Sequence, residues 1–285
     1  MDNVIENALY IVPTPIGNLT DLTMRAVETL KNVDYIGAED TRHSQLLLDH
    51  YGIKTKMFSL HDYNEIQKRD YLVNTIRDGK AVALISDAGT PLISDPGYHV
   101  VSYCREQGVK VIPLPGPCAA ITALSASGLP TDKFIFMGFL PTKEKALQQE
   151  LQSIADETRT CVFYESPKRI IYTMEAVAEV LGAERRVVIG RELTKTFESF
   201  YDLPAGRMLE FLKEEPNRTR GEFVLMIAGV KNRSEISSSV VETMKLLLKE
   251  LPLKKVAAVC ASIYNLKKNE LYDYALNHGL TGRDC

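Results

Sequence analysis

The sequence predicts an α/β protein with two tandem α/β domains followed by a small helical extension. Through most of the 285 residues, short apolar segments alternate with longer segments of helical periodicity, and this alternation is typical of mainly parallel sheets. The proline-rich segment 113–117 (PLPGP) divides the alternation into two halves and has the composition of a linker. We therefore expect domains at residues 1–114 and 115–232 and the extension at 233–285.

The first half alternates expected strands with expected helices. Thr20 or Asp21 can cap the first helix, because both side chains accept hydrogen bonds from helix N-termini. In each helix an apolar stripe is expected to be buried, and in helix 65–78 it contains Ile66, Leu72, Val73 and Ile76. The expected strands are 9–12, 33–38, 56–60, 81–85 and 109–114, and the later helices are 44–51, 65–78 and 97–107.

The second half repeats this pattern, so a second mainly parallel sheet is expected. Ser166, followed by Pro167, predicts the start of a helix that ends at Leu181, since serine caps helices and proline suits the first helical position. The expected strands are 134–139, 160–164, 186–189, 197–203 and 223–230, and the other helices are 118–127, 143–154 and 205–215.

The extension is expected to hold helices up to 249, at 253–263 and at 267–277. The last two suggest a helix-turn-helix unit that contacts nucleic acid or ribosome, and the alternative is a plain bundle for dimerisation or stability. From residue 231 onward the chain has nine basic and six acidic residues, although its overall net charge is −3. This excess is either a pointer to a polyanionic partner or chance. The residues expected to face outward are Lys267, Lys268, Asn269 and Tyr272.

The amino-acid composition limits the classes of protein to which the chain can belong. Hydrophobic residues make up 45% and charged residues 25% of the chain, as in an ordinary globular protein. The five cysteines occur singly, without a CxxC pair, which predicts a reduced protein without structural zinc. The first residues are acidic and unlike a secretory signal, and no apolar run approaches the roughly 20 residues that span a bilayer. A cytoplasmic location is therefore expected.

Several common catalytic motifs are absent from the sequence. It contains no GxGxxG and no GxxxxGK[ST], the phosphate-cradling signatures of dinucleotide and nucleoside triphosphate sites. No HExxH or paired His and Cys spacing points to a metal, and no GxSxG elbow points to a serine hydrolase. The site is therefore expected to hold no metal.

The segment 83–97 (ALISDAGTPLISDPG) predicts a ligand-binding loop at the end of a strand. Its glycines let the backbone approach a small molecule, its prolines stiffen the turns, and ligands bind at the carboxyl ends of strands in open α/β sheets. Similar polar or Gly/Pro-rich loops from both halves are expected to form a cleft between the domains. They lie at 14–18, 39–42, 87–97, 115–120, 165–169, 191–195 and 221–223.

These loops resemble those of the tetrapyrrole methylase superfamily, in particular its ribosomal branch. The resemblance rests on Val12–Asp21 (VPTPIGNLTD), Ala38–Arg42 (AEDTR), Ser86–Gly97 and Pro115–Pro117, and it continues through Gly138–Pro141, Phe163–Pro167, Arg191–Lys195 and Gly221–Glu222. It covers nearly the whole chain, including the extension. The branches that make corrins and haems carry a glycine-rich first loop, which is replaced here by Pro13–Pro15. Lys168 stands where the ribosomal branch usually has histidine.

The resemblance implies S-adenosylmethionine in a cleft between the two domains. It also implies methylation of a ribose 2′-oxygen of a cytidine in 16S ribosomal RNA of the small subunit, by a homodimer. By position, the residues expected to bind the cofactor are Ile16, Asp87, Ala88, Gly89, Thr90, Pro117, Ala119, Ala120, Tyr164, Leu193, Glu222 and Phe223. Those expected to bind RNA are Arg42, Lys143, Lys168, Arg169, Lys267 and Lys268.

The expected reaction is an in-line displacement in which positioning does most of the work, assisted by a general base. The candidate bases are Glu39, Asp40, Asp95 and Glu165, and Arg42, Lys143 and Lys195 are candidate electrostatic partners or RNA contacts. Two rival functions remain open from the sequence: a methyltransferase for a small tetrapyrrole precursor, and a non-catalytic RNA-binding assembly factor.

Overall fold

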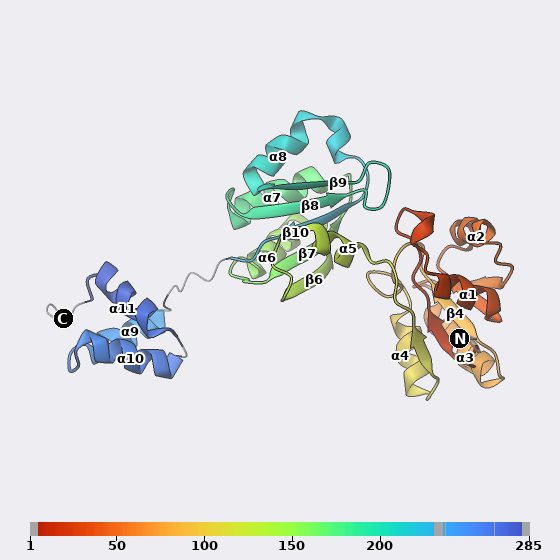
Figure 1. Cartoon of the computed structure of the whole chain (residues 1–285), viewed down its shortest axis with the longest axis horizontal. Coiled ribbons are helices and arrows are strands. Elements are labelled where there is room, and N and C mark those ends of the chain that lie inside the picture. The colour runs from red at the N-terminus through yellow and green to blue at the C-terminus, as the bar shows by residue number, and fades with distance from the viewer. Residues whose placement is uncertain (1–4, 231–235, 237, 265, 281–285) are drawn as a thin grey trace. The chain divides into compact units, whose positions relative to one another are not determined.

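The computed structural model describes residues 5–230, 236, 238–264 and 266–280 (Figure 1). The chain divides into two compact units, Met1–Gly229 and Val230–Cys285. The first unit holds two five-stranded sheets with helices, and the regular elements described in the second are helices. The predicted α/β fold with a helical extension is confirmed. The predicted boundary at 232/233 lies outside the described residues.

The first sheet is parallel throughout, as predicted. Parallel strands end at a common edge, so the loops that follow β1, β2 and β4 come together there. The strand order is β3-β2-β4-β1-β5, with β1 (Leu9–Ile11), β2 (Tyr35–Ala38), β3 (Lys56–Ser59), β4 (Val82–Ile85) and β5 (Val111–Pro113).

Helices cover both faces of this sheet. Because successive side chains of a strand point to opposite faces, Leu9 and Ile11 of β1 join one core cluster while Tyr10 joins the other. Helices α1 (Met24–Asn32) and α2 (Thr41–His50) pack on the face of Tyr10. Helices α3 (Glu65–Arg77) and α4 (Tyr98–Glu106) pack on the face of Leu9 and Ile11.

The second sheet corrects the prediction of a mainly parallel arrangement. Only β6 and β7 pair in parallel, and the other three pairs are antiparallel. Strand β10 lies between β7 and β8 and runs against both, while a short loop joins β8 to β9, a connection that permits only antiparallel pairing. The order is β6-β7-β10-β8-β9, with β6 (Phe134–Phe139), β7 (Thr160–Glu165), β8 (Arg186–Arg191), β9 (Ser199–Pro204) and β10 (Phe223–Ile227).

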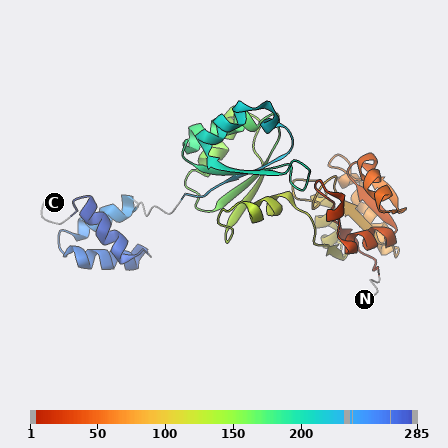
Figure 2. The ribbon, with the colours of Figure 1, turned by 45° about the horizontal axis from the view of Figure 1, so that its top comes forward.

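The helices of the second half also cover both faces of their sheet (Figure 2). Helix α5 (Ala119–Ala126) packs on one face with Val162, Val188 and Met226. The other face carries α6 (Glu144–Ser153), α7 (Ile170–Leu181) and α8 (Ala205–Glu214), followed by a 3₁₀ turn, Pro216–Thr219.

Two helix starts differ from the prediction. Helix α1 is capped by Thr23, whose Oγ1 accepts a hydrogen bond from the Ala26 N–H at 3.1 Å, while Thr20 and Asp21 belong to a 3₁₀ turn. Helix α7 begins at Ile170, after a turn in which the Ser166 carbonyl accepts the Ile170 N–H at 3.1 Å. Ser166 is therefore the start of the turn and not the helix cap.

One predicted core position is also wrong. Ile66 is 51% exposed, whereas the neighbouring Glu65 is buried. The helical periodicity predicts that Ile66 points inward. The structure buries Glu65 instead, because its carboxylate accepts a hydrogen bond from the Gly97 N–H inside the protein.

The second unit has a core of its own. Helices α9 (Ser238–Leu247), α10 (Leu253–Tyr264) and α11 (Lys268–Asn277) enclose fully buried side chains that include Met244, Cys260 and Leu271. Within the described ranges, no helix combines the length and apolar character that crossing a membrane requires. The four side chains predicted to face outward are exposed: Lys267, Lys268, Asn269 and Tyr272.

Candidate functional site

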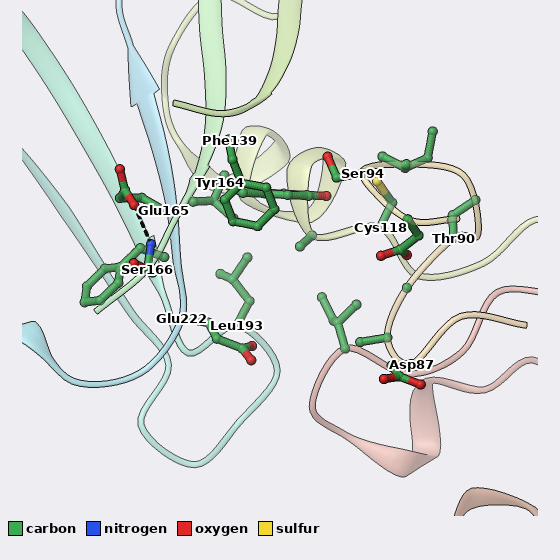
Figure 3. A pocket seen from close by; sticks show the side chains of 18 of the residues that line it. Asp87, Thr90, Ser94, Cys118, Phe139, Tyr164, Glu165, Ser166, Leu193 and Glu222 are labelled. Carbon is green, nitrogen blue, oxygen red and sulfur yellow. Dashed lines mark hydrogen bonds between the residues drawn. The ribbon is translucent and has the colours of Figure 1, made fainter. Parts of the chain in front are cut away.

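A cavity of about 450 Å³ lies in the first unit, where loops from both sheets meet (Figure 3). The first half contributes the loops after β1, β2 and β4, and the second half contributes residues from β6, β7, β10 and the loop after β8. The lining residues are Ile16, Glu39, Asp87–Asp95 without Pro91 and Leu92, Cys118, Ala119, Phe139, Tyr164–Pro167, Leu193 and Glu222–Val224.

The loop after β4 is fixed to its neighbours by hydrogen bonds. Thr14 and Gly89 exchange two backbone hydrogen bonds, at 2.9 and 3.0 Å. The Thr14 hydroxyl donates to the Ser86 carbonyl at 3.1 Å, and the Thr90 hydroxyl donates to the Pro117 carbonyl at 2.8 Å. Gly89 has φ +83°, and a Cβ there would lie 3.3 Å from Ile16 Cγ2. Glycine therefore keeps this wall close to the ligand space.

The far end of the same loop is anchored by a buried carboxylate. Glu65 is 3% exposed, and its Oε2 accepts a hydrogen bond from the Gly97 N–H at 3.0 Å. Gly97 has φ +119°, and a Cβ there would lie 2.8 Å from Leu84 Cδ2. The carboxylate and the glycine together fix the exit of the loop into α4.

Both loops that face each other across the cavity contain left-handed residues that are not glycine. Leu92 and Ser94 have φ of 73° and 67°, and Glu192 and Thr194 have φ of 51° and 64°. Such conformations are unfavourable for residues with a Cβ and persist where the surroundings over-determine them, often at functional sites. The strain is thus concentrated on the two walls of the cavity.

Aromatic side chains form the wall contributed by the second half. The Tyr164 ring makes edge contacts with Phe136 at 5.0 Å and Phe139 at 5.6 Å between centroids. Its hydroxyl oxygen accepts a hydrogen bond from the Ala120 N–H at 3.3 Å. Burial raises the pKa of Tyr164 well above its ordinary value, so the phenol stays neutral. Figure 3 shows Tyr164 and Leu193 on one side of the cavity and Asp87 and Thr90 on the other.

The charged residues among those that line the cavity are all acidic in the part of the chain that the structure describes. Burial, followed by repulsion from Asp87, Asp95 and Asp62, raises the pKa of Glu39 to about 7, although a hydrogen bond from the Asp87 backbone opposes the shift. Burial also raises the pKa of Asp95 to about 6, against a hydrogen bond from Ser86 and with repulsion from Asp87 and Asp62. Glu39, Asp87 and Asp95, called here the acidic wall, favour a cation and include a carboxylate that can accept a proton near neutral pH.

Glu165 lines the cavity but is already saturated with partners. Its Oε1 accepts the Ser166 N–H at 2.7 Å, and its Oε2 accepts the Thr173 hydroxyl at 2.6 Å and lies 3.5 Å from Arg169 Nη2. Arg169 also donates to the carbonyls of Leu140 and Pro141, at 2.9 and 2.8 Å. This cluster holds the ends of β6 and β7 together.

Lys195 belongs to the loop after β8 but does not line the cavity. Its Nζ contacts Glu192 Oε1 at 3.1 Å and Glu222 Oε2 at 2.9 Å. The Glu222 N–H also donates to Glu192 Oε1 at 2.9 Å. A Cβ on Gly17 would lie 2.5 Å from Lys195 Cγ, so the first loop of the chain packs directly on this ion-paired loop.

The structure brings most of the predicted cofactor residues together at the cavity. Pro117 and Ala120 are outside the lining but hold Thr90 and Tyr164 through hydrogen bonds. Those that line it are Ile16, Asp87, Ala88, Gly89, Thr90, Ala119, Tyr164, Leu193, Glu222 and Phe223.

The predicted catalytic and RNA-binding residues are more dispersed. Glu39, Asp95 and Glu165 line the cavity, and Arg42 is exposed in the first turn of α2. Asp40 caps that helix: its Oδ1 accepts the Arg42 N–H at 2.8 Å, and this bond, with that from His43, lowers its pKa. Lys143 and Lys168 are exposed, whereas Lys267 and Lys268 belong to the second unit.

Several lining residues were not among the predicted cofactor or catalytic residues, although most of them lie in loops that were predicted to form the cleft: Ile93, Ser94, Cys118, Phe139, Ser166, Pro167 and Val224. Ser94, Ser166 and Pro167 stand in the motifs that carry the resemblance, so they could have been included. Phe139 stands in such a motif too, Gly138–Pro141, whereas Val224 is an ordinary apolar strand residue whose position at the cavity depends on sheet order, which the sequence does not reveal.

No group of His, Cys, Asp and Glu suited to a metal ion occurs among the described residues. Four cysteines there are free thiols, and Cys285 lies outside the described residues.

Two family profiles match the chain. The profile described as Tetrapyrrole (Corrin/Porphyrin) Methylases matches residues 8–208, and the profile described as RsmI C-terminal HTH domain matches residues 234–279. The chain is similar to the Ribosomal RNA small subunit methyltransferase I of Vibrio cholerae, with 55% identity over 95% of this chain and 94% of the relative. It is 45% identical to the Pseudomonas aeruginosa protein of the same name, over 94% of this chain and 96% of the relative.

Solved structures share the fold at lower identity. The methyltransferase CobJ has a TM-score of 0.58 and 15% identity, over 78% of this chain and 94% of that chain. A uroporphyrin-III-C-methyltransferase from Thermus thermophilus has a TM-score of 0.51 and 18% identity, over 77% and 93% of the two chains. At these identities the likeness concerns the fold alone.

The anchor at Glu65 gives a test of the loop's construction. Replacing Glu65 by leucine leaves the buried Gly97 N–H without an acceptor, which we expect to lower the free energy of unfolding by about 1–3 kcal/mol. Glu65→Gln keeps an acceptor oxygen and serves as the matched control, with a smaller loss. Urea denaturation measures both changes, and equal losses in the two variants would contradict this role of the carboxylate.

Proposed function

We infer the function from the family, because the chain belongs to the tetrapyrrole (corrin/porphyrin) methylases and, along nearly its whole length, resembles curated ribosomal RNA methyltransferases. We propose that it transfers a methyl group from S-adenosylmethionine to the ribose 2′-oxygen of a cytidine in 16S RNA of the small ribosomal subunit. The observation that carries this proposal is the near full-length similarity to those relatives, which includes the helical extension. A homodimer in the cytoplasm is part of the same proposal.

The cavity fits the proposed cofactor. Its 450 Å³ lies within the range of small-molecule sites, and the acidic wall suits the sulfonium and ammonium charges. The apolar side chains of Ile16, Leu193 and Phe139 suit the uncharged parts of such a molecule. We assign cofactor binding to the lining residues predicted from the sequence, with Pro117 and Ala120 holding them in place.

The chain's own groups favour one carboxylate as the base. S-adenosylmethionine, when bound, supplies an electrophilic methyl group whose transfer leaves a neutral thioether. Asp40 is engaged as a helix cap and Glu165 by its three partners, which leaves Glu39 and Asp95. We assign to Glu39 the acceptance of the 2′-hydroxyl proton, because its pKa of about 7 is close to the operating pH, where general bases are most effective.

The same charges weigh against the two rival functions. Tetrapyrrole precursors carry several carboxylates, and a cavity whose charged lining residues are acidic would repel them. A non-catalytic assembly factor would have no use for a partly buried carboxylate whose pKa is held near neutral pH. Both rivals remain distinguishable by experiment.

The proposed activity is tested by incubating the protein with methyl-labelled S-adenosylmethionine and small ribosomal subunits, followed by nuclease mapping of the RNA. We expect the label on a ribose 2′-oxygen of one cytidine. Label in a tetrapyrrole precursor alone would favour the first rival. Tight subunit binding without transfer would favour the second.

The role of Glu39 is tested by its pH dependence. In the wild type, kcat/KM for the RNA should rise with pH through about 7, because this ratio reports the ionisation of the base in the free enzyme. Glu39→Gln should lower kcat/KM for the RNA by about 10²–10⁴-fold. It should raise the Kd for S-adenosylmethionine by a much smaller factor, because Asp87 and Asp95 still supply the negative charge of the acidic wall. Steady-state kinetics and calorimetry measure the two quantities.

Asp62 provides the matched control. It lies outside the cavity lining but contributes to the raised pKa of Glu39. Asp62→Asn should therefore move the rise in kcat/KM to lower pH without reducing its maximum. Wild-type turnover of Glu39→Gln at pH 8, or an unmoved pH profile in Asp62→Asn, would remove Glu39 from this role.

A further inference from the structure

A second cavity, of about 560 Å³, adjoins the first through two shared loops. Glu192 lines the second cavity and Leu193 the first, while Gly221 lines the second and Glu222 the first. The two cavities have no lining residue in common, so the residues of the second are separate from those assigned to the cofactor and to the base. The lining residues are Arg191, Glu192, Phe197, Tyr201, Glu215, Asn217, Arg218, Arg220 and Gly221.

Two arginines give this cavity positive charge that its own carboxylates do not cancel. Arg191 donates to the carbonyls of Arg220 and Asn217, at 2.6 and 3.0 Å, so these partners fix its guanidinium without neutralising it. Arg220 is exposed, and its side chain has no hydrogen bond or ion pair to any described residue.

The acidic residues of the cavity are already paired. Glu192 contacts Lys195 at 3.1 Å, and Glu215 contacts Arg218 at 2.8 Å. Arg191 contributes to the lowered pKa of Glu192 as a smaller cause, after burial, which opposes the shift, and the bonds from Glu222 and Lys195. Lys195 and Arg218 each also pair with a second carboxylate, Glu222 at 2.9 Å and Glu214 at 2.7 Å. Among the described residues, the arginines of this cavity without a carboxylate in ion-pair distance are therefore Arg191 and Arg220, and these are the ones that can take an anionic ligand.

The cavity also presents an aromatic ring that packs against nothing in the core. Phe197 is 71% exposed and belongs to none of the core clusters of the described residues. Tyr201 and Arg218 pack on Phe211 instead, at 4.7 and 3.8 Å from its ring centroid. An exposed ring beside guanidinium groups that no carboxylate neutralises is the combination that binds single-stranded nucleic acid, by stacking a base and holding the backbone.

The acidic lining of the first cavity gives a reason for a separate site that binds the RNA backbone. A ribose that reaches the acidic wall brings negatively charged phosphates with it, and Glu39, Asp87 and Asp95 would repel them. We propose that the second cavity binds the RNA nucleotide next to the methylated one, with Arg220 and Arg191 on a phosphate and Phe197 stacked on the base. This inference rests on the proposed function, since it takes the target ribose to lie in the first cavity.

The test compares the affinities of three variants for small ribosomal subunits by filter binding at several salt concentrations. Phe197→Ala and Arg220→Ala should each raise Kd about tenfold, the scale of one lost stacked base or charged contact. Arg220→Ala should also reduce the slope of log Kd against log salt by about 1, whereas Phe197→Ala should leave the slope unchanged. Phe197→Trp should restore binding.

Matched controls come from exposed residues of the same kind elsewhere. Tyr71 is 59% exposed, and the Arg207 side chain is 76% exposed. Tyr71→Ala and Arg207→Ala should bind like the wild type, and all variants should keep the wild-type Kd for S-adenosylmethionine, which shows that they are folded.

The two proposals can fail separately. Kd values for Phe197→Ala and Arg220→Ala within twofold of the wild type would overturn the inference, even if the wild type methylates the RNA. A wild type that binds subunits without transferring a methyl group would overturn the proposed activity, while the Kd comparison would still decide whether this cavity binds RNA.

Discussion

The electrostatics of the first cavity depend on repulsion among carboxylates that share a partly buried space. Glu39, Asp87 and Asp95 lie on one wall, and the charged residues described in the cavity lining include no base to neutralise them. This repulsion favours a cationic ligand, keeps one carboxylate available as a proton acceptor and excludes phosphates. The assignment of the cofactor to the first cavity and of the RNA backbone to the second both follow from it.

The wall can exist only because the backbone around it is held firmly. The Thr14–Gly89 hydrogen bonds join two loops of the first sheet, and Glu65 anchors the exit at Gly97. Across the cavity, Lys195 joins Glu192 and Glu222. These contacts stabilise the left-handed residues on both walls, whose conformations the chain would not otherwise adopt.

Much of this fold, and part of the site, could be predicted from sequence. The strand positions followed from short apolar runs, and a ligand loop at 83–97 was predicted because glycine and proline leave a backbone-rich loop at a strand end. The individual cofactor residues of that loop, Asp87, Gly89 and Thr90, were predicted from the family resemblance. The antiparallel pairing in the second sheet could not be predicted, since the position of β10 between β7 and β8 depends on packing between distant segments. The pairing of the candidate bases could not be predicted either, because only the structure shows that Glu165 is saturated by Ser166, Thr173 and Arg169.

The most direct test of this account is the titration of the Glu39 carboxyl, followed by NMR of protein labelled with ¹³C at glutamate side chains. The account predicts a midpoint of about 7 in the wild type. It also predicts a lower midpoint in Asp87→Asn, which removes one repelling charge. A Glu39 carboxyl that titrates near its ordinary pKa of 4.5, and does so equally in both proteins, would contradict it.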